Sequence, residues 1–114
     1  MTIRDNPTMV VEVMSFSDIN TKIENYQDSL VVLYFSGFVS TKESRRSKEL
    51  IIQLSQELRN KVLFLHCPYE HEEIRDFYEV IGLPWFVLFR NMEKIDSLEG
   101  GTLEEITFFI KSNI

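Results

Sequence analysis

Hydrophobic residues in this chain form short continuous runs that alternate with longer segments in which they recur every three or four positions. The run at 30–35 (LVVLYF) is apolar throughout, which is typical of a strand covered on both faces. Three other runs contain β-branched or aromatic residues, which favour strands, and the run at 94–98 is shorter and more polar. Five strands are predicted, at 9–14 (MVVEVM), 30–35 (LVVLYF), 62–67 (VLFLHC), 85–89 (WFVLF) and 94–98 (KIDSL).

The intervening segments show helical spacing. Ser15 or Ser17 can cap the first predicted helix, and T-x-x-E at 102–105 is a capping box for the last one. Gly82 ends the third helix, and the two glycines at 100–101 separate the last strand from the fourth helix. The apolar stripes of the four helices are Phe16, Ile19, Ile23 and Tyr26; Leu50, Ile51, Leu54 and Leu58; Ile74, Phe77 and Tyr78; and Leu103, Ile106, Phe109 and Ile110. The second helix opens at Ser40 or Thr41 and ends near Asn60, and the third lies within Glu70 to Val80.

The predicted order is therefore β-α-β-α-β-α-β-β-α. Helical crossovers between the first three strands make them parallel, and the four residues 90–93 allow only a hairpin between the last two. The fold class is α/β, with a mixed central sheet and helices on both faces.

Composition adds limits on function. The 114 residues are enough for one domain, predicted at 9–114 after an N-terminal extension at 1–8. The net charge of −6 argues against binding to nucleic acid, which needs a basic field. No apolar run is long enough for a membrane span, the start has no secretory pattern, and the single cysteine suits a reducing compartment. We therefore expect a cytoplasmic protein, a monomer or weak homodimer, without cofactor or metal.

Two local sequences, together with this order, resemble the thioredoxin family. Residues 29–42 (SLVVLYFSGFVSTK) stand where thioredoxins have a core strand, an aromatic residue and the Cys-Gly-Pro-Cys motif. Residues 81–89 (IGLPWFVLF) resemble the family's cis-proline segment and the strand after it. The resemblance covers about residues 9–114 and implies a thioredoxin-like fold. It also implies that the peptide bond between Leu83 and Pro84 is cis.

The same resemblance shows that the catalytic residues of the family are replaced. The four motif positions are Val39, Ser40, Thr41 and Lys42, so neither cysteine is present. The buried acid of the family falls at Leu33, and the aromatic before the motif is Phe38. Dithiol oxidoreduction needs a thiolate and a resolving thiol, so no catalytic residue is predicted. The tail, FVLFRNMEKIDSLEGGTLEEI, is also similar to the thioredoxin-like domain of multidomain monothiol glutaredoxins, which implies partner binding.

Cys67 is the one residue that could retain redox chemistry, and only as a single thiol. Its position at the end of a buried strand favours a core role. His66 and His71 flank it, but successive strand residues point to opposite faces, so a metal site is not predicted. The hydroxyls of Ser40, Thr41 and Ser44 are read as helix caps, because no nucleophile elbow or adjacent His–acid pair supports a serine nucleophile.

Two features favour binding to a protein. Four basic residues lie within seven positions, which is either a solvated helix face or a docking patch for an acidic partner: Lys42, Arg45, Arg46 and Lys48. In the family, the positions of Phe38, Leu83, Pro84 and Trp85 border the groove where peptides lie. The sequence therefore predicts a redox-inactive binding module. An atypical monothiol oxidoreductase acting through Cys67, or a structural subunit of a complex, stays open as an alternative.

Overall fold

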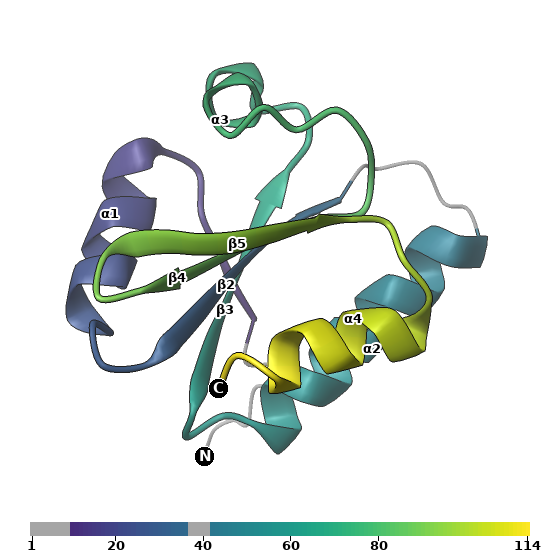
Figure 1. Cartoon of the computed structure of the whole chain (residues 1–114). Coiled ribbons are helices and arrows are strands. Elements are labelled where there is room, and N and C mark those ends of the chain that lie inside the picture. Colours follow the sequence, from purple (N-terminus) through teal and green to yellow (C-terminus); the bar gives the residue numbers. More distant parts are fainter. Residues whose placement is uncertain (1–9, 37–41) are drawn as a thin grey trace, which may run out of the picture.

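The structure is a computed structural model of the 114-residue chain, and it describes residues 10–36 and 42–114, with side chains of the second helix described from Arg45 onward. The predicted order of elements is confirmed (Figure 1). The elements are β1 (Val10–Glu12), α1 (Phe16–Asn25), β2 (Leu30–Ser36), α2 (Lys42–Glu57), β3 (Val62–Pro68), α3 (Glu72–Phe77), β4 (Trp85–Arg90), β5 (Glu93–Glu99) and α4 (Leu103–Lys111).

One five-stranded sheet forms the centre of the molecule, in the order β1-β3-β2-β4-β5. Strands β1, β2 and β3 are parallel, as the helical crossovers predicted. Strand β4 runs antiparallel to β2 and forms the predicted hairpin with β5. The apolar run of β2 lies in the middle of the sheet, and every residue from Leu30 to Phe35 is buried, because helices cover both faces.

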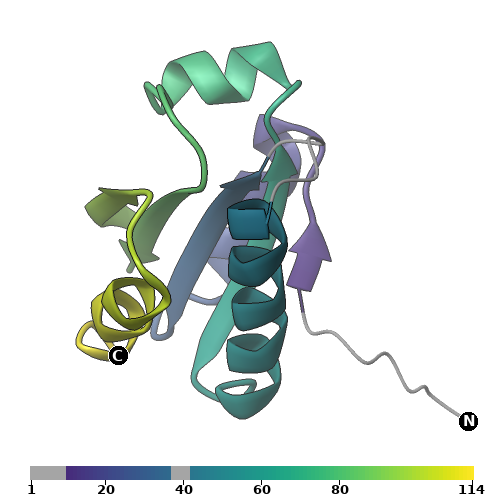
Figure 2. The same cartoon turned by 90° about the vertical axis from the view of Figure 1, so that its right-hand side faces the viewer.

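Helices lie on both faces of the sheet, so the molecule has two hydrophobic cores (Figure 2). Helices α1 and α3 pack on one face, where Ile19, Ile23 and Ile74 meet the side chains of Leu33 and Phe35. Helices α2 and α4 pack on the other, where Ile51, Leu54, Ile106 and Ile110 meet Val32 and Tyr34. The alternation of faces along β2 therefore divides its side chains between the two cores.

Local signals in the sequence explain where the helices begin. The side chain of Ser15 accepts a hydrogen bond from the N–H of Asp18, so Ser15 is the residue that caps α1. The predicted capping box of α4 is confirmed in both directions between Thr102 and Glu105, at 3.1 and 2.8 Å. None of the described helices is long and apolar enough to cross a bilayer.

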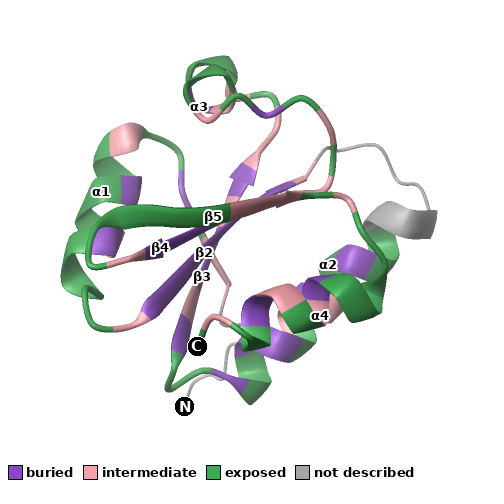
Figure 3. Cartoon of the chain, viewed as in Figure 1, coloured by how far each residue is buried: buried purple, intermediate pink, exposed green. Residues whose placement is uncertain are grey.

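Several predicted boundaries and stripe positions differ from the structure. Strand β1 has only three residues, α2 ends at Glu57 and α3 spans only Glu72–Phe77. Tyr26 follows α1 as its C-cap, and Phe77 is 68% exposed, so neither belongs to a buried stripe. Figure 3 shows that β2 and β4 are largely buried, whereas buried and exposed segments alternate along α1. The reason is geometric: helical spacing places a residue on one side of a helix but does not say how far the neighbouring layer extends.

Candidate functional site

The candidate site lies at the edge of the sheet where β2 and β3 end and β4 begins. Ser36 pairs with Pro68 across the parallel strands, and Phe35 pairs with Trp85 across the antiparallel ones. The register therefore brings the end of β2 next to Pro84, which directly precedes β4. The peptide bond between Leu83 and Pro84 is cis, as predicted.

The loop before β4 presents apolar side chains to solvent and contains peptide groups that make no backbone hydrogen bond to the described residues. Ile81 is 78% exposed and Leu83 40% exposed. Within residues 10–36 and 42–114, the peptide groups of Leu83 have no backbone hydrogen-bond partner. The loop is nevertheless held in place, because the N–H of Gly100 donates a 2.7 Å hydrogen bond to the carbonyl oxygen of Pro84.

Trp85 is half-buried, and its ring packs against the core beneath α1 and α3. Its indole N–H is buried without a hydrogen-bond partner in the described part of the chain. Leu33, at the position of the family's buried acid, is fully buried and pairs with Leu65 and Val87. It is part of an apolar layer, so no described titratable group replaces that acid at this position.

The positions expected to correspond to the redox motif lie largely outside the described residues. This holds for Phe38, Val39, Ser40 and Thr41, and Lys42 is described only as the first residue of α2. Among the other predicted basic residues, Arg45, Arg46 and Lys48 are exposed on the first half of α2. That half of the helix begins six positions after Ser36, the last residue of β2.

Cys67 has the opposite of the environment that activates a thiol. Its side chain is fully buried near the end of β3, and Sγ lies 3.6 Å from the carbonyl oxygen of Pro68. Burial, followed by the negative charges of Glu12 and Glu70, raises the pKa of this thiol to about 12. Reactive cysteines need a low pKa and access to solvent, so the geometry supports the predicted core role.

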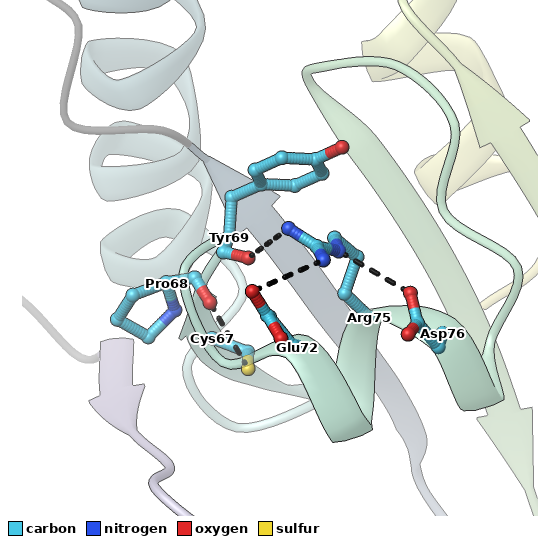
Figure 4. A network of polar contacts seen from close by, with 6 residues as sticks. All are labelled: Cys67, Pro68, Tyr69, Glu72, Arg75 and Asp76. Carbon is cyan, nitrogen blue, oxygen red and sulfur yellow. Dashed lines mark hydrogen bonds and ion pairs between the residues drawn. The ribbon is translucent and has the colours of Figure 1, made fainter.

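Arg75 of α3 stabilises the turn that follows Cys67 (Figure 4). Its guanidinium lies 4.6 Å from the centre of the Tyr69 ring and donates to the Tyr69 carbonyl oxygen. The same group contacts the carboxylates of Glu72 and Asp76 at 3.9 and 3.4 Å. These contacts join the end of β3 to α3 and keep the turn packed over Cys67.

The two histidines do not come together with Cys67. His71 directly precedes α3, and the residues that the structure describes contain no group of three side chains suited to a metal ion. His66 instead bonds on both sides, with Glu12 Oε2 at 2.5 Å from Nδ1 and Ser36 Oγ at 2.6 Å from Nε2. Sequence reasoning missed this cluster. Its only signal was that Glu12 and His66 are polar residues within otherwise apolar strands.

Comparison with known proteins places this geometry in a recognised fold. No family model matches the chain, and no curated protein sequence matches it. Solved structures do. The germline-specific thioredoxin Deadhead of Drosophila melanogaster has a TM-score of 0.80 at 22% identity, covering 91% of this chain and 99% of its own. The thioredoxin preprotein of Schistosoma mansoni has a TM-score of 0.82 at 21% identity, covering 94% and 100%.

A third structure, the thioredoxin of Fasciola hepatica, has a TM-score of 0.83 at 19% identity and covers 91% of this chain and 99% of its own. At these identities the likeness shows the fold alone. The chain therefore has the thioredoxin fold, as the resemblance of its sequence implied, and its function has to be argued from its own site.

Proposed function

We propose that this protein is a redox-inactive thioredoxin-like module that binds an extended segment of a partner protein along the loop 81–84. The observation that carries the proposal is the exposed, apolar edge formed by Ile81 and Leu83 at the cis-proline turn. Peptide groups without partners, next to apolar side chains, suit the addition of an extended peptide in the manner of a further strand.

The charge expected of the partner segment follows from the charge of the residues exposed on α2. Arg45, Arg46 and Lys48 are exposed on α2, which follows the end of β2 in the chain, and the whole molecule carries a net charge of −6. A local basic surface on an acidic protein favours partners with an acidic segment and disfavours basic ones. Phe38 and Val39 belong to the proposed groove on the basis of the sequence resemblance, together with Pro84 and Trp85.

The resemblance of residues 86–106 to the binding domain of multidomain monothiol glutaredoxins supports the same reading. A cytoplasmic location is part of the proposal, because one unpaired Cys67 suits a reducing compartment. The alternative, a monothiol oxidoreductase, requires Cys67 to become exposed and ionised. Its complete burial and a pKa of about 12 weigh against that reaction.

The test uses photo-crosslinking from two equally exposed positions. A benzophenone amino acid replaces Ile81, which is 78% exposed, or Phe108 on α4, which is 74% exposed. We expect the protein with the label at 81 to capture acidic segments from a cell extract, and the matched label at 108 not to capture them. Capture of the same segments from both positions, or from neither, would contradict the proposal.

Captured segments are then synthesised as peptides, and their affinity is measured by fluorescence anisotropy. Leu83→Asp should weaken binding at least tenfold, whereas Leu103→Asp, at a site of equal exposure on α4, should leave it unchanged. Reversal of Arg45 and Arg46 to Glu should also weaken binding and reduce its dependence on salt, since the attraction to an acidic peptide is lost. Reversal of Arg59 and Lys61 is the matched control.

A further inference from the structure

A chain of three hydrogen-bonded side chains crosses β1, β3 and β2 on the face that α2 covers. Glu12 pairs with His66, and His66 pairs with Tyr34, in the two parallel registers. Ser36 lies two residues after Tyr34 and therefore projects from the same face. The order of the strands thus aligns a carboxylate, an imidazole and a hydroxyl, with separations of 2.5 Å from Glu12 Oε2 to Nδ1 and 2.6 Å from Nε2 to Ser36 Oγ.

The partners determine the direction of these hydrogen bonds when the imidazole is neutral. An ionised carboxylate only accepts, so Nδ1 of His66 carries the hydrogen and donates it to Glu12. Nε2 is then an acceptor, and the hydroxyl of Ser36 donates to it. This is the arrangement in which a base, oriented by an acid, withdraws the proton of a nucleophile.

A further hydroxyl lies beside the chain. The phenol of Tyr34 is buried, and the hydroxyls of Ser47 and Ser36 lie near it, although the contacts fall short of regular hydrogen-bond geometry. Burial raises the pKa of Tyr34, and those two hydroxyls offset the rise only in part, so the phenol stays protonated. A neutral hydroxyl beside a nucleophile can donate to an oxyanion that forms there.

The flanking side chains open on a small cavity. Its volume is about 200 Å³, and it is lined by Tyr34 and His66 together with the apolar side chains of Val10, Ile51 and Ile52. Glu12 and Lys48 also line it, and Glu12 is 60% exposed at its side chain, whereas His66 is 19% exposed. Ser36 is not among the residues that line the cavity, which lies beside His66 and Glu12. The cavity is therefore assigned to the far, aliphatic end of a short acyl group, for which it has room.

We propose that Ser36 is a nucleophile for acyl transfer from small, activated aliphatic esters, with His66 as its base and Glu12 as the residue that positions His66. The Oγ–H bond of Ser36 breaks, its proton passes to Nε2 of His66, and Oγ forms a bond to the carbonyl carbon. The bond from that carbon to the leaving oxygen breaks, and the alcohol leaves with the proton from Nε2. Water then gives a proton to Nε2 of His66 as its oxygen bonds to the acyl carbon. The bond from that carbon to Oγ breaks, Oγ takes the proton from Nε2, and the acid is released.

Neither Cys67 nor the proposed peptide-binding loop takes part in this step. Cys67 follows His66 in β3 and projects into the core beneath α1 and α3, on the opposite face of the sheet. Acyl transfer is therefore independent of the Cys67 thiol, and Cys67→Ala should leave it unchanged.

The test is covalent labelling of the whole protein with a fluorophosphonate probe, followed by peptide mapping by mass spectrometry. We expect the wild-type protein to carry one phosphonate, on Ser36, because fluoride leaves as Oγ attacks phosphorus. Mapping on the unaltered protein does not depend on the folding of a variant. No phosphonate under excess probe, or one on another residue, would overturn the proposal.

Rates of labelling and of hydrolysis of p-nitrophenyl butyrate then test the roles of the residues. His66→Gln should lower both rates about a hundredfold, and Glu12→Gln by a smaller factor, whereas Ser36→Ala should abolish labelling. Matched controls are His71→Gln, Ser97→Ala and Cys67→Ala, which should keep the wild-type rates. A His66→Gln variant that reacts as fast as the wild type, while its thermal unfolding is cooperative, would show that the chain of hydrogen bonds is structural only.

Discussion

The N–H of Gly100 donates a 2.7 Å hydrogen bond to the carbonyl oxygen of Pro84, and so joins the end of β5 to the turn that carries the proposed binding loop. Gly100 can do this because its φ is +65°, a conformation that costs little only in glycine and a few polar residues. The loop that precedes β4 is therefore held in place by a residue that lies 16 positions later in the chain.

Gly100→Ala should lower the free energy of unfolding by about 1 kcal/mol, measured by urea denaturation. Apart from the chain neighbours of Gly100, no atom of residues 10–36 and 42–114 lies within 4 Å of a Cβ at this position, so the expected cost comes from the backbone alone. Gly100→Asn should recover part of it, because Asn tolerates positive φ better than Ala. Equal stability of the Ala and Asn variants would mean that the backbone conformation at Gly100 is not the source of the loss.

The turn between β4 and β5 is another place where the backbone adopts a positive φ, here at residues that carry a side chain. Asn91 and Met92 have φ values of 52° and 68°, which match a type I′ hairpin with two loop residues. Met92→Gly should raise the free energy of unfolding by about 0.5–1 kcal/mol, because glycine adopts this conformation without strain and half of the Met92 side chain is exposed. Met14→Gly, at a site that is 58% exposed and has no positive φ, is the control and should give no gain.

The buried thiol predicts slow alkylation of the folded protein. With a pKa of about 12, only roughly one Cys67 in a thousand is ionised at pH 9 in the native state. Iodoacetamide should therefore label Cys67 far more slowly in native protein than in urea, as measured by intact mass. Native labelling as fast as in urea at pH 8 would instead favour the monothiol oxidoreductase.

The raised pKa of the Cys67 thiol also predicts how the free energy of unfolding depends on pH. The pKa of Cys67 is raised in the folded state, so the unfolded chain loses this proton first as pH rises. The free energy of unfolding should fall by about 1.4 kcal/mol per pH unit between about pH 9 and 12. Tyr34 and Tyr78, whose pKa values burial also raises, should add to the fall at higher pH. In Cys67→Ala the slope from pH 9 to 10 should be smaller, and an unchanged slope would contradict the assignment.

The position of the degenerate motif can be tested by rebuilding it. If residues 39–42 occupy the site of Cys-Gly-Pro-Cys, Val39→Cys with Lys42→Cys should form an internal disulfide and show weak reductase activity. The N-terminus of α2, together with Arg45 and Arg46, should lower the pKa of the thiol at 39. Val39→Cys with Glu49→Cys is the control. Failure of the 39–42 pair to oxidise within one molecule would remove the basis for placing Phe38 in the groove.

The sequence by itself determined the elements and their order. A strand buried on both faces must be apolar throughout, as 30–35 is, and a helix that covers a sheet must repeat its apolar residues every three or four positions. Helical crossovers then make β1, β2 and β3 parallel, and the short link predicted at 90–93 allows only a hairpin. These relations are local, so they can be read from neighbouring residues, as can the capping box at Thr102 and Glu105.

The tertiary structure alone decided which distant residues meet. Glu12 and His66 are 54 positions apart, and Ser36 and His66 are 30 apart, so their contacts depend on the strand order β1-β3-β2. The packing of the elements also determines which side chains are exposed. Ile74 and Phe77 share the spacing of one helix, yet only Ile74 is buried against the sheet. Periodicity fixes the direction of a side chain relative to its own helix or strand, whereas its neighbours come from the packing of elements that are remote in the chain.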